Sequence, residues 1–470
     1  EALTDFWESF QEFYKAPDDS IYQNLVIQKA QLFVSRSDTI YSGLKSYQYN
    51  INTQIKDDIN RVNELGDTIR DLNTQIQKIE AGNIETAMTL RDVRDQALDE
   101  LSSLVDISYK ETTTGVVTVS IEGQEFIDEL NCRHIEMQTD KTTGFVTPYW
   151  GYLSDPSQNQ YTYLFNFNRD ISTENKNDMG EIKALVLARG DKVADYTDVE
   201  GVDKRTYNDT TDMSVMLRAE AQLDQLFHNI VTSLNDILCP NVAASEYITG
   251  LAGGGSVTMT GVGGTTYTVD KNTLILDMDN CSVGADGSLP PQELFSRIGT
   301  DRYTEVSYTD PATGEAKTYY IYNEEDPTDG TKQYTMRSVS VNDALVLDET
   351  VLPHLKQNGD VDQALAAALA AAWENSSLSL SPNDTNTYNF KEYYTAMIGE
   401  LGTYGDVFGS NATNLQQSLL TVDNQRQNVI GVSSDEELTY MIKYQNAYNA
   451  SSRFINVINE MIEHLITQLG

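Results

Sequence analysis

A seam of apolar residues, spaced three, four or seven positions apart, runs through the first hundred residues of the chain. Its members are Leu44, Ile51, Ile55, Ile59, Val62, Leu65, Ile69, Leu72, Ile76 and Ile79. Residues 21–79 contain no proline and only two glycines, so the spacing predicts one long helix of the coiled-coil type. Similar spacing returns over residues 88–105 after a short link, which predicts a second helix antiparallel to the first.

The pattern changes to alternation at Asp106, which indicates β-structure through the middle of the chain. Residues 107–121 alternate around a turn at 113–115 and predict a hairpin. Alternating aromatic residues over 161–167 predict a further strand, and the polar segment 175–178 predicts a loop. A helix is then expected over residues 213–238, with Pro240 as its stop.

Residues 241–340 are expected to form a small β-rich insert. Seven glycines lie between residues 250 and 264, where we expect a loop or hairpin turn because no Gly-Lys-Ser/Thr motif follows them. The short connections between the later strand-like segments favour antiparallel pairing. These segments are 265–269, 273–276, 303–308, 318–322 and 333–341.

Helical patterning resumes at Val361, and a last helix is expected to begin at the serine cap and acidic residues of 433–437. We also expect a helix over about residues 390–429 to pack against the helices predicted between 21 and 105. The apolar seam of the last helix is the candidate assembly interface: Leu438, Met441, Tyr448, Ile455, Ile458, Ile462, Leu465 and Leu469. Because this seam must be buried against something, residues 434–470 are expected to be the least stable segment of the isolated chain.

The composition argues against several classes of partner. The chain has 32 Lys and Arg against 71 Asp and Glu, a net charge of −39, which disfavours nucleic acid. The longest apolar run, Ala364 to Trp373, is about half as long as a membrane span, so no membrane partner is expected. Three distant cysteines, Cys132, Cys239 and Cys281, are expected to be small, partly buried apolar residues.

The sequence contains no familiar catalytic or metal-binding motif. The histidines lie far apart, and the acidic segment 277–286 fails as a calcium loop because Cys281 and Ser282 occupy key positions. We therefore expect no catalytic, cofactor-binding or metal-binding residues and no enzyme activity. Two alternatives stay open, namely an adhesin-like insert that binds glycans or surfaces through its tyrosine-rich strands, and an insert with hydrolase activity.

Several segments resemble the flagellar hook-filament junction proteins, the family of the first hook-associated protein. Residues 90–107, LRDVRDQALDELSSLVDI, are similar to the run RDQLLDELSxLVDI of that family. Residues 431–438, GVSSDEEL, and 444–455, YQNAYNASSRFI, resemble the C-terminal signature of flagellar axial proteins. Residues 180–190 are similar to the family's GELxALLxLRD segment, with Gly190 where an acidic residue is usual.

The resemblance implies a multidomain α+β fold, in which both chain ends form a long antiparallel helical shaft and β-rich domains are inserted between them. We expect residues 1–106 and 341–433 to form the N-terminal and C-terminal segments of the shaft. Between them we expect a mixed β/α region, 107–240, and the variable insert, 241–340, and the assembly helix should occupy 434–470. Because the family begins with a further N-terminal stretch, we expect the chain to be a fragment that lacks it.

The resemblance also implies a structural role in the bacterial flagellum. The implied partners are other copies of the chain in a ring, the hook protein, adjacent junction or filament proteins and a flagellar export chaperone. The implied location is extracellular, at the junction of hook and filament, after export without a cleavable signal peptide.

Overall fold

The computed structural model describes residues 1–82, 86–167, 177, 179–251, 253–310, 314–430, 441–443 and 445. Contacts between residues divide the chain into two units, Glu1–Ile398 and Gly399–Gly470. Helices make up about half of the chain and the strands form several small sheets, which confirms the α+β class. Within the described ranges, no helix is both long and apolar enough to cross a membrane.

The helices follow the predicted seams closely. The described α-helices are α1 (Ala2–Lys15), α2 (Ser20–Glu80), α3 (Met88–Leu104), α4 (Glu181–Arg189), α5 (Lys204–Asp209), α6 (Val215–Leu238), α7 (Asp343–Leu347), α8 (Gln363–Ala371) and α9 (Phe390–Ile430). The long predicted helix is confirmed as α2, which has 61 residues. Its seam is buried from Ile51 to Ile76, whereas Ile79 is exposed near the helix end.

The helix α1 was not predicted, and it packs along the beginning of α2. Its residues Phe6, Phe10 and Phe13 are buried, and the ring of Phe6 stacks on that of Phe33 with centroids 5.4 Å apart. Asp19 separates the two helices and caps α2, because its carboxylate accepts a hydrogen bond from the backbone N–H of Ile21.

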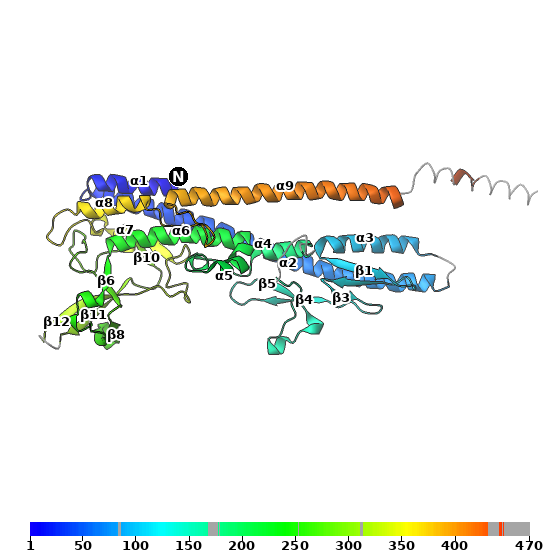
Figure 1. Ribbon diagram of the computed structural model, residues 1–470, viewed down its shortest axis with the longest axis horizontal. Helices are drawn as coiled ribbons and strands as arrows, with labels where there is room; N and C mark the ends of the chain where they lie inside the picture. Colours follow the sequence, from blue (N-terminus) through cyan, green and yellow to red (C-terminus); the bar gives the residue numbers. More distant parts are fainter. Residues whose placement is uncertain are drawn as a thin grey trace, which may run out of the picture. The chain divides into compact units, whose positions relative to one another are not determined.

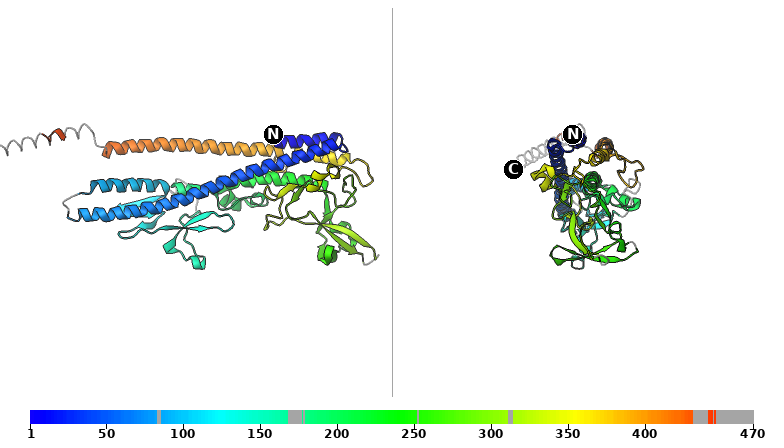
Figure 2. Two further views of the ribbon diagram at one scale, coloured as in Figure 1. Left: turned by 180° about the vertical axis from the view of Figure 1, so that it is seen from behind. Right: turned by 90° about the vertical axis from the view of Figure 1, so that its left-hand side faces the viewer.

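The helix α3 runs antiparallel to the C-terminal half of α2, as predicted (Figures 1 and 2). Arg61 of α2 meets Glu100 near the end of α3 at 2.7 Å, whereas Glu80 at the end of α2 meets Arg91 near the start of α3 at 2.7 Å. Apolar side chains fill the space between the helices, among them Leu65 and Leu101.

Two small sheets follow α3 in the chain and pack against the helix pair. The strands β1 (Ile107–Glu111), β2 (Val117–Ile121) and β3 (Gln124–Ile127) form one antiparallel sheet, and β4 (Ile135–Thr139) pairs with β5 (Val146–Trp150). The predicted hairpin over 107–121 is therefore confirmed. The strand predicted over 161–167 is wrong, because only Tyr163 pairs with β5, as an isolated bridge to Tyr149. Hydrogen bonds from Trp150 N to Thr162 O and from Leu164 N to Pro148 O form this bridge.

The side chains that cover α2 differ from those that the sequence pattern predicted. The pattern predicted that α2 would be covered by residues 390–429, and Leu65 and Leu72 are indeed buried. The core around Leu65, however, is built from α2, α3, α4 and the neighbouring strands, with Phe126 and Trp150 fully buried in it. Burying each such large apolar side chain contributes about 1.5–3 kcal/mol.

The predicted insert forms a six-stranded antiparallel sheet that follows directly on the end of α6 and lies below it in the view of Figure 1. In spatial order its strands are β6 (Asn241–Ala243), β9 (Leu274–Leu276), β12 (Ala316–Tyr322), β11 (Tyr303–Thr309), β7 (Ser256–Gly261) and β8 (Thr266–Asp270). The glycines 263 and 264 lie in the β7–β8 hairpin turn, as expected. The sheet has a small core of its own, which includes Met259, Ile275 and Val306.

The strand predicted over 333–341 is mostly wrong. Within it, Val339–Val341 forms β13, which pairs with β10 (Phe295–Arg297). The preceding residues form a buried turn instead, because the Ser338 hydroxyl donates to Gln333 O and accepts from Thr335 N. The predicted loop 175–178 lies outside the described residues except for Asn177.

Candidate assembly surface and metal-ligating cluster

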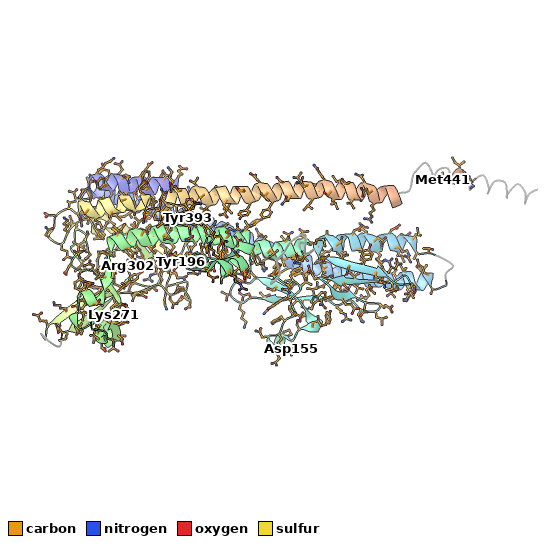
Figure 3. The ribbon with its side chains drawn as sticks, viewed as in Figure 1. Asp155, Tyr196, Lys271, Arg302, Tyr393 and Met441 are labelled. Atoms are coloured by element: carbon orange, nitrogen blue, oxygen red, sulfur yellow. The ribbon has the colours of Figure 1, made fainter. Side chains whose placement is uncertain are left out.

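Of the predicted assembly residues, the structure describes Met441, whose side chain is exposed (Figure 3). Those outside the described residues are Leu438, Tyr448, Ile455, Ile458, Ile462, Leu465 and Leu469. The helix expected over 434–470 also lies outside the described ranges, apart from 441–443 and 445, so its low stability stays a prediction.

The first turns of α9 are fixed within the first unit by aromatic packing and hydrogen bonds. A capping box begins the helix, because Asn389 Oδ1 accepts from Glu392 N and Glu392 Oε2 accepts from Asn389 N. The Phe390 ring meets Trp373 edge to face with centroids 5.5 Å apart. Tyr393 is fully buried, and its hydroxyl donates to Gln225 Oε1 of α6 at 2.8 Å (Figure 3).

The segment of α9 in the second unit carries an apolar seam with coiled-coil spacing. Successive members alternate between gaps of four and three residues. They are Leu401, Gly405, Phe408, Ala412, Leu415, Leu419 and Val422, which we call the α9 seam. Four of its five large side chains are open to solvent, with 54% of Phe408, 69% of Leu415, 68% of Leu419 and 60% of Val422 exposed, and Leu401 is partly exposed.

An exposed row of this kind is typical of a helix that another helix covers in an assembly. The sequence pattern predicted a helix over 390–429, but no assembly residue was assigned to it. The alternating spacing was the available signal.

A hollow of about 920 Å³ lies between α1 and the beginning of α9, within the first unit. Its lining includes Trp7, Trp373, Lys391 and Glu392. The indole nitrogens of both tryptophans are buried without a hydrogen-bond partner.

Arg302 joins the six-stranded sheet to α6 (Figure 3). Its guanidinium lies 2.6 Å from the Asp236 carboxylate and 3.8 Å from Glu293, and it contacts the faces of Tyr303 and Tyr322 at 5.7 and 4.9 Å from the ring centres. Burial raises the pKa of Glu293, and the nearby guanidinium offsets some of that rise. A buried arginine with these partners fixes the insert to the helical portion of the unit.

Two buried carboxylates on α6 hold loop backbones. Glu220 accepts hydrogen bonds from Ala194 N at 3.0 Å and from the Gln48 side chain, and Asp224 accepts from Met336 N at 2.8 Å and from Tyr196 N at 3.1 Å. Burial raises the pKa of each carboxyl to about 7. Raised carboxyl pKa values also occur in hydrolase sites, but these two groups bind backbone N–H groups, which is a structural role.

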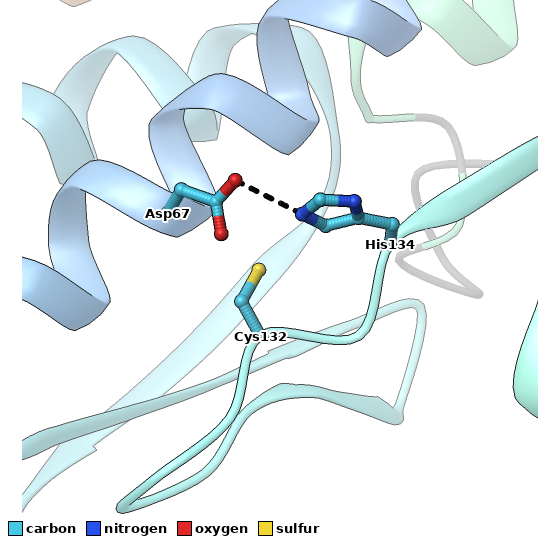
Figure 4. Close-up of side chains that lie close together, drawn as sticks. All are labelled: Asp67, Cys132 and His134. Atoms are coloured by element: carbon cyan, nitrogen blue, oxygen red, sulfur yellow. Dashed lines mark hydrogen bonds and ion pairs between the residues drawn. The ribbon is translucent and has the colours of Figure 1, made fainter.

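A third group, Asp67, Cys132 and His134, brings three possible metal ligands together (Figure 4). Their ligand atoms all lie within 4.8 Å of one another. Sequence reasoning missed this cluster because Asp67 lies on α2 and the other two residues lie between β3 and β4. The spacing Cys132-x-His134 was the one signal in the sequence.

Two segments of the chain match models of flagellar protein families. Residues 1–245 match the family model described as flagellar hook-associated protein FlgK helical domain. Residues 425–469 match the model described as flagellar basal body rod FlgEFG protein C-terminal.

Individual relatives cover nearly the whole chain. Flagellar hook-associated protein 1 of Bacillus subtilis strain 168 is 22% identical over 477 residues, which is 100% of this chain and 76% of the relative. The protein of the same name from Salmonella typhimurium is 21% identical, over 99% of this chain and 80% of the relative. The flagellar hook junction protein FlgK from Burkholderia pseudomallei has a similar fold, with a TM-score of 0.54 and 14% identity over 92% of this chain and 93% of that one.

Proposed function

The chain belongs to the FlgK family of flagellar hook-associated proteins, and we propose that it is a structural component of the bacterial flagellum that forms the junction between hook and filament by self-assembly. The family match over residues 1–245 carries this proposal. The matched relatives named above are described as hook-associated or hook junction proteins, and none as an enzyme or an adhesin. We therefore assign the chain no catalytic activity and no glycan binding.

The proposed assembly surface is helical. We assign it to the α9 seam and to the predicted residues from Leu438 to Leu469, because residues 425–469 match a C-terminal region shared with rod proteins. A row of large exposed apolar side chains stabilises an assembly when a partner buries it, because apolar surface is then removed from water. In this proposal the two chain ends form an antiparallel helical shaft, and the β-rich regions between 107 and 340 are inserted into it.

The proposed partners are further copies of the chain in a ring, the hook protein and adjacent junction or filament proteins. An export chaperone would bind the chain before assembly. The proposed location is outside the cell on the flagellum, reached by export without a cleavable signal peptide.

Labelling and complementation test the proposal together. Gold-labelled antibody against this chain should mark purified flagella at the hook end, and label along the filament would contradict a junction role. In a strain that lacks the gene, the full-length protein with Ile455→Asp and Ile462→Asp should give few filaments, because each buried charge costs several kcal/mol at every subunit contact. The matched control, Asn456→Asp with Thr467→Asp, adds the same charge away from the seam and should restore filaments.

A further inference from the structure

Asp67, Cys132 and His134 converge from two separate elements of the fold (Figure 4). His134 Nε2 lies 3.0 Å from Asp67 Oδ2, and Cys132 Sγ completes the group within 4.8 Å. Cys132 and His134 are two positions apart in the connection from β3 to β4. In extended backbone this spacing places both side chains on one side, which here faces α2 (Figure 4).

Neighbouring residues hold the group in place. A Cβ atom at Gly66 would lie 2.6 Å from Cys132 Sγ, so the glycine allows the thiol to approach the backbone of α2. Arg70 binds Asp67 Oδ1 at 2.8 Å and leaves Oδ2 toward the histidine. The Asn63 side chain accepts from Ile135 N and donates to Ile135 O, both at 2.9 Å, which fixes the backbone next to His134. The three ligands are therefore positioned before any ion binds.

Arg133, the residue between Cys132 and His134, makes its contacts outside this group. The Arg133 guanidinium lies 2.7 Å from Glu125 and 4.7 Å from the centre of the Tyr152 ring. A positive charge so engaged does not occupy the space between the sulfur, nitrogen and oxygen ligands.

We propose that Asp67, Cys132 and His134 bind a divalent transition-metal ion, for which Zn²⁺ fits best. Thiolate, imidazole and carboxylate together form a typical zinc ligand set, and a soft thiolate argues against Ca²⁺ and Mg²⁺. Three protein ligands leave a fourth tetrahedral position for water. The net charge of −39 also favours cations near the protein surface.

Binding changes the protonation of two ligands. The thiolate form of Cys132 binds the ion, so the S–H proton is displaced and leaves to solvent. At the histidine, the ion takes the Nε2 lone pair and the ring proton resides on Nδ1. One proton is released for each ion bound, and Zn²⁺ binding should therefore weaken as the pH falls.

The bound ion would link α2 to the β3–β4 connection. Because the ion binds the folded chain, it should raise the unfolding temperature in proportion to the logarithm of its concentration. The metal site would thus reinforce the region of the first unit where the small sheets meet the helix pair.

The test uses the full reduced chain, freed of metal with a chelator, and Co²⁺ and Zn²⁺ as probes. We expect one ion per chain, with an ultraviolet charge-transfer band that reports a cobalt–thiolate bond. Cys132→Ser should abolish this band, and His134→Gln should weaken Zn²⁺ binding by at least roughly 100-fold, since loss of even an outer partner of a ligand weakens binding about 10- to 100-fold.

Two controls separate loss of a metal ligand from loss of an unrelated thiol and from misfolding. Cys281→Ser removes a thiol elsewhere in the unit and should keep the band and the affinity. The His134 side chain is half exposed, so His134→Gln should fold even if Cys132→Ser does not. Absence of the band in the unchanged chain, or equal Zn²⁺ affinity in all variants, would mean that cations bind only to the acidic surface and would overturn the proposal.

Discussion

Gly66 on α2 packs directly against the ring of Phe126, because a Cβ atom at position 66 would stand 2.5 Å from Phe126 Cζ. Phe126 is fully buried and lies next to Trp150, with ring centroids 6.4 Å apart. A glycine inside a helix costs about 1 kcal/mol relative to alanine. The close approach of the β3 strand to α2 gives the physical reason for this glycine.

A comparison of two glycines of α2 tests this interpretation. Gly66→Ala should lower the free energy of unfolding by about 1–3 kcal/mol, because the added methyl group forces Phe126 and Cys132 away from the helix. Gly43→Ala should instead raise it by about 0.5–1 kcal/mol, since a Cβ there meets nothing within 4 Å. Chemical denaturation of both variants measures the difference. Equal stabilisation by the two changes would contradict the packing described here.

The buried carboxyl of Glu220 predicts a pH dependence of stability. Its pKa is raised from 4.5 to about 7 in the folded chain, so the folded state binds the proton more tightly than the unfolded state does. The resulting stabilisation is complete below pH 4.5 and is lost as the pH rises toward 7, by about 3 kcal/mol in total.

Glu220→Gln removes this titration while keeping an acceptor for Ala194 N. The stability of the unchanged chain minus that of the variant should therefore fall between pH 4.5 and 7. Glu246→Gln serves as control, because this change removes a carboxyl group from an exposed position. Thermal unfolding across this pH range measures both differences, and a flat difference for Glu220→Gln would show that its burial is not retained in solution.

The sequence was sufficient to predict the helices and strands in which apolar residues recur at a regular spacing. The regular seam from Ile51 to Ile76 was sufficient for α2, and the alternation over 107–121 was sufficient for the β1–β2 hairpin. The helix α1 was missed, although Phe6, Phe10 and Phe13 follow helical spacing, because it is short and precedes the long seam.

The contacts between distant segments could not be predicted in the same way. Cover for Leu65 within its unit comes from α3, α4 and the neighbouring strands. The sequence could not show this, because periodicity identifies a buried face without identifying its partner. The cluster of Asp67 and Cys132 likewise depends on how the β3–β4 connection crosses α2. The α9 seam, by contrast, is readable from spacing alone.

Arg302 should be essential for attachment of the six-stranded sheet to α6. Arg302→Gln leaves Glu293 buried without its cationic neighbour, which should cost about 3–5 kcal/mol. We expect faster hydrogen exchange over residues 241–322 and little change in α2 and α3. Lys271→Gln, an exposed change on the same sheet, is the control (Figure 3). Equal exchange in both variants would mean that the sheet is held without Arg302.

The α9 seam should be needed for assembly but not for folding. Leu415→Asp with Leu419→Asp places charges on two exposed side chains, so the stability of the isolated chain should change by less than about 0.5 kcal/mol for each substitution. In an assembled flagellum a partner helix would bury both positions, and each charge would then cost several kcal/mol.

The matched control is Gln417→Asp with Thr421→Asp, which adds the same charge on the opposite side of α9. In a strain that lacks the gene, the full-length control protein should restore filaments and the seam variant should not. Circular dichroism and unfolding temperature of the purified chains separate failed assembly from failed folding. Normal filament numbers with the seam variant would mean that α9 is not covered by a partner helix, and the assembly surface would then have to lie elsewhere in the chain.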